Sequence, residues 1–180
     1  VVGLWAEILR AVPQARLILK DAAFADTGQV VRDRGLFAKD DVSVDRLEFI
    51  PKTATHAEHL ALYSRVDIGL DSFPYNGCTT TCDALWMGVP VVTLAGAMSF
   101  NRYGVTLLSN LGADDLITTT SGAYVEKAVA LATDRKRLMA LRAELRPRMA
   151  ASPLCDAKTL TCEVENAYRS MWHRWCKSGA

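Results

Sequence analysis

A short polar segment, residues 76–83 (NGCTTTCD), contains side chains suited to binding phosphate. It lies between two apolar runs that read as buried strands. Asn76 and Gly77 favour a sharp turn, and Thr79, Thr80 and Thr81 follow where a helix begins. Free amides in the first turn of a helix, together with threonine hydroxyls, form a cradle for a phosphate or diphosphate. Asp83 follows on the same helix and could accept hydrogen bonds from a ribose.

The residues alone leave a second interpretation open for this segment. Threonine is a common N-cap, so one of the three could simply cap a helix that packs in the core. Residue types do not decide between capping and ligand binding.

The elements around this segment alternate between strands and helices. Short connections between such elements predict a parallel sheet covered by helices on both faces, which is a Rossmann-like α/β fold. In such sheets ligands bind beyond the carboxyl ends of the strands, and segment 76–83 follows a strand. Strands are expected at 15–20, 46–50, 67–71, 89–94 and 115–118, and helices at 2–12, 26–37 (closing near Gly35), 56–66, 79–86, 102–111, 122–133, 135–149 and 156–175.

The chain opens on a helix, whereas a Rossmann-like domain normally opens on a strand. We therefore expect residues 1–180 to form one nucleotide-sugar-binding lobe that lacks its first strand and belongs to a longer protein.

Composition excludes several classes of protein. The formal net charge is +1, with 21 basic and 20 acidic side chains, which argues against a nucleic-acid-binding surface. No apolar run has the length of a membrane span and no signal peptide is visible. The five cysteines are scattered, which favours reduced thiols and a cytoplasmic location.

The segment YNGCTTTCDALWMGVPVVTL resembles the signature of the O-GlcNAc transferase and SPINDLY group, glycosyltransferase family 41. The similarity extends from FIPKTATHAEHLALYSRVDIGLD to SPLCDAKTLTCEVENAYRSMW, nearly the whole chain. It implies a GT-B architecture, with two Rossmann-like lobes, of which this chain resembles the carboxy-terminal, donor-binding lobe. The implied donor is UDP-GlcNAc.

The resemblance assigns roles to individual residues. Thr79 and Thr80, with Cys78 and Thr81 beside them, match positions around the donor diphosphate, and Asp83 matches the ribose contact. Cys78 replaces a histidine of the animal enzymes, and cysteine cannot make the same charge-assisted bond.

The positions that match the base-binding region depart from the animal enzymes. Ala54 and His59 match residues that enclose uracil, His56 replaces a lysine, and Leu62 replaces an arginine. These departures keep GDP-fucose, the donor of the SPINDLY branch, open as an alternative, as well as a non-catalytic scaffold with a degenerate nucleotide site.

The resemblance further implies an inverting transfer to serine or threonine hydroxyls that needs neither metal nor cofactor. The catalytic lysine, the acid–base groups and the acceptor site of the family match no residue of this chain, so we expect no catalytic residue in it. Acceptor protein would bind through the other lobe and through tetratricopeptide repeats. The isolated chain is expected to be inactive.

Other features allow two interpretations each. Arg102 could reach a phosphate or bridge two loops. His56, His59, Cys78 and Cys82 could be imagined as a zinc site, but their spacing matches no common finger. The apolar stripe of the last helix could pack on the other lobe or, when exposed, favour self-association.

Overall fold

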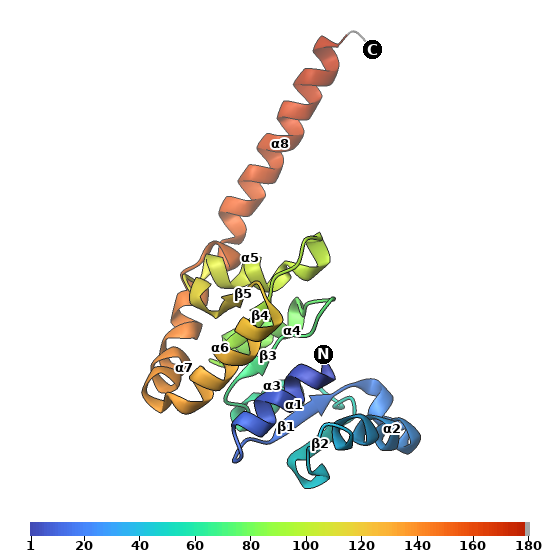
Figure 1. Cartoon of the computed structure of the whole chain (residues 1–180). Coiled ribbons are helices and arrows are strands. Elements are labelled where there is room, and N and C mark those ends of the chain that lie inside the picture. Colours follow the sequence, from blue (N-terminus) through green and yellow to red (C-terminus); the bar gives the residue numbers. More distant parts are fainter. Residues whose placement is uncertain (179–180) are drawn as a thin grey trace.

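The computed structural model of the chain describes residues 1–178 and shows parallel strands flanked by helices (Figure 1). Every strand pairing in the described residues is parallel, as predicted. The strands form a two-stranded sheet, β1-β2, and a three-stranded sheet, β3-β4-β5. Their bounds are β1 Leu17–Lys20, β2 Leu47–Ile50, β3 Gly69–Leu70, β4 Val91–Leu94 and β5 Ile117–Thr118.

The predicted helices are present, with ends that differ by a few residues. The largest difference concerns α3, which ends at Leu62 instead of Val66, with a 3₁₀ turn over Tyr63–Arg65 in place of its last residues. Helix α2 continues through Gly35 to Ala38 because Phe37 is buried in the core and holds the last turn in place. The helices are α1 Val2–Ala11, α2 Thr27–Ala38, α3 His56–Leu62, α4 Thr79–Trp86, α5 Tyr103–Asn110, α6 Ser121–Thr133, α7 Arg135–Ala150 and α8 Ala157–Lys177.

The core has two apolar clusters, one for each sheet. A chain of hydrogen bonds joins them: the indole of Trp5 donates to the Tyr124 hydroxyl at 3.1 Å, and this hydroxyl donates to the Asp71 carbonyl at 3.0 Å. Tyr124 is fully buried, and burial raises the pKa of its phenol well above the ordinary value. The first turns of α1 thereby lie beside the carboxyl end of β3.

The last helix, α8, extends away from the rest of the molecule (Figure 1). Its N-cap is Asp156, whose carboxylate accepts from the Thr159 amide at 3.0 Å. All of its described residues are exposed, including Trp172 and Trp175, whose rings stack at 5.2 Å. None of the helices in residues 1–178 is both long and apolar enough to span a membrane.

Candidate functional site: an uncapped helix start beside a histidine–aspartate pair

The start of α4 carries no side-chain cap. Cys78 occupies the N-cap position with a non-extended backbone, and its side chain accepts no amide hydrogen bond. None of the threonines caps the helix either, so the capping interpretation does not hold. The first-turn amides therefore remain available to an anion, as helix N-termini that bind phosphate require.

The turn before α4 is held from both sides. The Asp71 carboxylate accepts from the Gly77 amide at 2.8 Å, and the Thr81 hydroxyl donates to the Gly77 carbonyl at 3.0 Å. A Cβ at Gly77 would lie 2.7 Å from Thr80 Oγ1 and 2.8 Å from Thr81 Oγ1. Only glycine allows the backbone to approach the threonine hydroxyls this closely.

The three threonines differ in exposure. Thr79 and Thr80 are exposed at the first turn of α4, where a ligand can reach them. Thr81 is buried and its hydroxyl is bonded to Gly77. This hydroxyl therefore stabilises the turn, and the two exposed threonines are the ones free to contact a diphosphate.

Asp71 anchors the turn to the sheet. Its carboxylate is buried at the end of β3 and accepts from the Thr93 hydroxyl of β4 at 2.6 Å, in addition to the Gly77 amide. Burial raises the pKa of the Asp71 carboxyl above its ordinary value, while hydrogen bonds from Thr93, Gly77 and Ser72 oppose that shift. The position of the turn before α4 thus depends on a buried carboxyl.

His59 joins three elements at the edge of the cradle. Its Nε2 lies 3.2 Å from Asp83 Oδ2 of α4, and its Nδ1 lies 2.9 Å from Nζ of Lys20, the last residue of β1. An ammonium group only donates, so Nδ1 accepts and Nε2 carries the hydrogen that Asp83 accepts. This arrangement brings together two predicted site residues, His59 and Asp83.

Tyr63, at the C-cap of α3, contacts both the His59 ring and the first turn of α4. Its ring meets the His59 ring edge-on at 5.3 Å, and its hydroxyl donates to the Thr80 carbonyl at 3.0 Å. Burial, with a smaller contribution from the Asp83 carboxylate, raises the pKa of Tyr63 to about 12. The phenol is therefore a neutral donor at physiological pH.

The other base-proximal residues lie around the start of α3. Thr55 caps this helix through the Glu58 amide, and the Glu58 carboxylate accepts from the Ala54 amide at 3.0 Å. His56 is exposed, with its ring 5.9 Å from that of His59. Ala54, His56 and His59 therefore lie along one helix start, next to α4.

Arg102 contacts the backbone of its own loop, the connection between β4 and α5. Its guanidinium donates to the Gly96 carbonyl at 3.1 Å, and the side chain is otherwise exposed.

Within residues 1–178, no three metal-ligating side chains are grouped closely enough to hold an ion. Cys82 is half-buried on α4, and burial raises the pKa of its thiol.

Comparison with known proteins identifies the family. The model of glycosyl transferase family 41 matches residues 1–164. The chain belongs to this family. The structure of an O-GlcNAc transferase variant from Thermobaculum terrenum matches this family-41 chain with a TM-score of 0.94 and 38% identity, over 99% of this chain and 34% of that one. The predicted fold, the carboxy-terminal lobe of a GT-B glycosyltransferase, is confirmed.

Curated relatives of this family-41 chain include proteins named SPINDLY and one named SEC. The probable UDP-N-acetylglucosamine–peptide N-acetylglucosaminyltransferase SPINDLY of Solanum lycopersicum is 42% identical over 98% of this chain, and SPINDLY of Arabidopsis thaliana is 40% identical. The Arabidopsis relative named SEC is 34% identical over 98% of this chain. The chain spans about a fifth of the length of these relatives, 18–19%.

Sequence reasoning missed two residues of the site, Lys20 and Asp71. Each lies at the carboxyl end of a strand, the position where ligands bind in parallel sheets, and this signal was available from the sequence. Their partners were not, because Lys20 and His59 are 39 residues apart in the chain, and Asp71 and Thr93 are 22 apart.

Proposed function

We propose that this chain is the donor-binding part of a glycosyltransferase that transfers a sugar from a UDP-sugar, such as UDP-GlcNAc, to serine or threonine hydroxyls of proteins. One observation carries the proposal: the uncapped start of α4 presents two exposed threonines beside the His59–Asp83 pair. Anion-binding amides and a ribose-binding carboxylate then lie on the same two turns of helix. The names of the relatives support the class of donor.

In this proposal the chain stabilises the leaving nucleotide. The diphosphate lies against the first-turn amides of α4 and the hydroxyls of Thr79 and Thr80. Asp83 accepts from the ribose and is held in position by His59. As the bond to the anomeric carbon breaks, negative charge grows on the diphosphate, and donors already oriented toward it lower the barrier. The attacking hydroxyl and its base come from outside these 180 residues.

The test is calorimetric titration of the chain with UDP and, separately, with GDP. Saturable UDP binding that Thr80→Val and Asp83→Ala both weaken supports the proposal. Thr106→Val, at an exposed threonine on α5, is the matched control and leaves affinity unchanged. Binding of neither nucleotide, in this chain and in the full-length protein, contradicts the proposal and favours a scaffold role.

A GDP-sugar is the second candidate donor. It is favoured by the 40–43% identity to proteins named SPINDLY, the branch for which the resemblance implies GDP-fucose, against 34% to the one named SEC. Preference for GDP over UDP in the same titration selects this donor.

A further inference from the structure

Three aromatic side chains gather beside the start of α4. The ring of Tyr75, in the loop between β3 and α4, stacks on the ring of Phe100, in the loop between β4 and α5, with the centroids 6.0 Å apart. The ring of Tyr103, the first residue of α5, meets the Tyr75 ring edge-on at 6.3 Å. Both loops project from the same side of the molecule (Figure 1). We call these three residues the aromatic cluster.

Hydrogen bonds within and between the two loops hold Tyr75 in place. The Asn76 amide donates to the Phe100 carbonyl at 3.1 Å, and the Ser72 hydroxyl donates to the Tyr75 carbonyl at 2.7 Å. Asn76 is fully buried, and its side-chain amide donates to the Ser72 carbonyl at 2.9 Å. The backbone on both sides of Tyr75 is therefore anchored.

Tyr75 is nevertheless largely open to solvent. It is 65% exposed, whereas Phe100 and Tyr103 are half-buried. Burial in the core therefore does not account for an aromatic ring at this position. A tyrosine that is held in place and exposed offers a large apolar contact surface, and it loses little conformational freedom when a ligand packs on it.

The aromatic cluster and the base-proximal residues lie on opposite flanks of α4. On one flank, His59 of α3 contacts Asp83, and His59 also lines the space between β1 and β3. On the other flank, the cluster joins the loop that follows β3 to the loop that follows β4, and β4 pairs with β3. The start of α4 thus lies between the two groups of residues.

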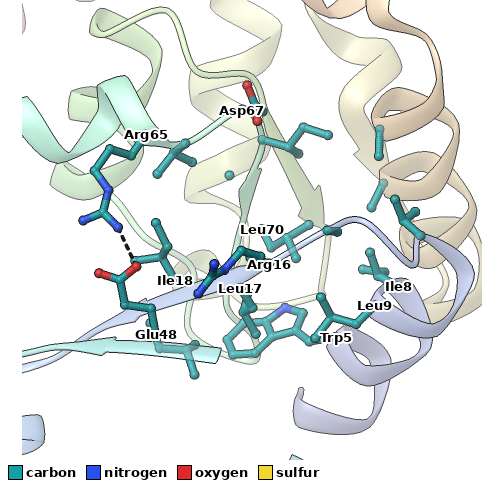
Figure 2. Close-up of a pocket in the computed structure, with 18 of the residues that line it drawn as sticks. Trp5, Ile8, Leu9, Arg16, Leu17, Ile18, Glu48, Arg65, Asp67 and Leu70 are labelled. Atoms are coloured by element: carbon teal, nitrogen blue, oxygen red, sulfur yellow. Dashed lines mark hydrogen bonds and ion pairs between the residues drawn. The ribbon is translucent and has the colours of Figure 1, made fainter. Parts of the chain in front are cut away.

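The proposed diphosphate position is at the surface between these flanks. A cavity of about 780 Å³ lies between β1 and β3, with mainly apolar walls that include Trp5, Leu17 and Leu70 (Figure 2). Among the described residues, none from α4 or from the loops 72–78 and 95–102 lines this cavity. A diphosphate at the start of α4 therefore lies outside the cavity, on the side of the aromatic cluster.

A nucleotide sugar has a fixed order of groups: base, ribose, diphosphate and sugar. In the proposed function the ribose lies at Asp83 and the diphosphate at Thr79 and Thr80, about one turn closer to the start of the helix. The sugar is the next group in this direction. Tyr75 precedes Thr79 by four residues, so the path that leads past the start of α4 reaches the aromatic cluster.

We propose that the Tyr75 ring, supported by Phe100 and Tyr103, packs against the apolar face of the donor's hexose and thereby favours the intact donor over the free nucleotide. The inference rests on the proposed function, because it requires the diphosphate to lie at the start of α4. A hexopyranose has a face of C–H groups, which packs on an aromatic ring while its hydroxyls bind polar groups. Tyr75 thus contacts the sugar and not the nucleotide.

Calorimetric titration of the full-length protein tests the proposal with two pairs of probes, UDP with UDP-GlcNAc and GDP with GDP-fucose. Tyr75→Ala should lower the affinity for the nucleotide sugar about threefold to tenfold. The affinity for the matching free nucleotide should stay within about twofold, since the lost contact is to the sugar alone. The Tm should be unchanged, because Tyr75 is mostly exposed.

Three further variants make the test specific. Tyr75→Phe keeps the ring and should keep both affinities. Tyr75→Leu keeps an apolar side chain without a ring and should lose affinity for the nucleotide sugar as Tyr75→Ala does. Tyr168→Ala on α8 is the matched control, because Tyr168 is 66% exposed, close to the value for Tyr75, and it should keep both affinities.

The outcomes separate this inference from the proposed function. Equal losses of affinity for nucleotide and nucleotide sugar in Tyr75→Ala would mean that the ring only supports the turn before α4. That result overturns the inference and leaves the proposed function intact, and so does unchanged affinity for both ligands. Binding of neither UDP nor GDP by the unaltered protein overturns the proposed function and this inference together.

Discussion

His59 Nε2 lies 3.2 Å from Asp83 Oδ2, and both side chains are less than one-fifth exposed. The contact joins α3 to α4. The start of α3 matches the base-binding region of the family, and α4 is the helix proposed to hold the diphosphate, so the contact fixes these two positions relative to each other. Lys20 extends the contact to β1. The positions proposed for the base, the ribose and the diphosphate are thus connected through one imidazole.

Lys20 should control which nitrogen of His59 carries the hydrogen. Lys20→Met removes the donor at Nδ1, so we expect the ring to populate the other tautomer or to rotate, and UDP affinity to fall about threefold to tenfold, corresponding to one hydrogen bond. Nitrogen chemical shifts of His59 report the tautomer, and calorimetry reports the affinity. Lys39→Met, at an exposed lysine on the far end of α2, is the control; identical His59 shifts in both variants would contradict the role of Lys20.

Thr80 and Thr81 should separate binding from stability. Thr80→Val removes an exposed hydroxyl at the helix start and should lower UDP affinity about threefold to tenfold with an unchanged Tm. Thr81→Val removes the buried bond to the Gly77 carbonyl and should lower the free energy of unfolding by about 1–3 kcal/mol. Calorimetric titration and urea unfolding of the two variants check the contrast, which the reverse pattern would refute.

Gly77→Ala should disrupt the cradle. The added Cβ would meet two threonine hydroxyls at 2.7 and 2.8 Å, so the turn or the first turn of α4 must shift, at a cost of about 1–3 kcal/mol. We expect both a lower Tm and loss of UDP binding. Gly3→Ala, whose Cβ has no atom within 4 Å, is the matched control, and equal behaviour of the two variants would show that the close approach has no role.

Asp71 should make stability depend on pH in the acid range. Because its pKa is raised in the folded state, the protonated carboxyl contributes stability below the ordinary pKa of 3.8, and this contribution is lost as the pH rises through the raised value. The difference in unfolding free energy between the native chain and Asp71→Asn should therefore shrink as the pH rises above 3.8. Urea unfolding from below that pH to neutrality measures it; a difference that grows with pH would mean that the carboxylate, not the acid, is the stabilised form.

The apolar stripe of α8 should drive self-association of the isolated chain. The stripe contains Trp172 and Trp175, which are 59% and 54% exposed. Exposed apolar area of this extent associates with other apolar surfaces. Sedimentation velocity should show a concentration-dependent shift that Trp172→Glu with Trp175→Glu removes and Arg169→Glu, on the same helix, does not. A chain that stays monomeric at all concentrations would contradict this.

Much of the fold could be predicted from the sequence because the signals for strands, helices and turns come from residues that are neighbours in the chain. Apolar runs placed the strands, helical spacing placed the helices, and Gly77 with the threonines marked the turn proposed to bind phosphate. The length of α2 was misjudged at Gly35, because the low helix propensity of glycine was outweighed by the burial of Phe37, a tertiary effect.

By itself the sequence determined the order of the elements, the parallel α/β class and the position of the polar helix start proposed to bind a ligand, since each depends on residues a few positions apart. Only the tertiary structure decided which threonine is buried, which carboxylate holds the turn, and that Lys20 reaches His59. These depend on contacts between residues 4 to 39 positions apart. Their geometry is set by how the helices pack on the strands.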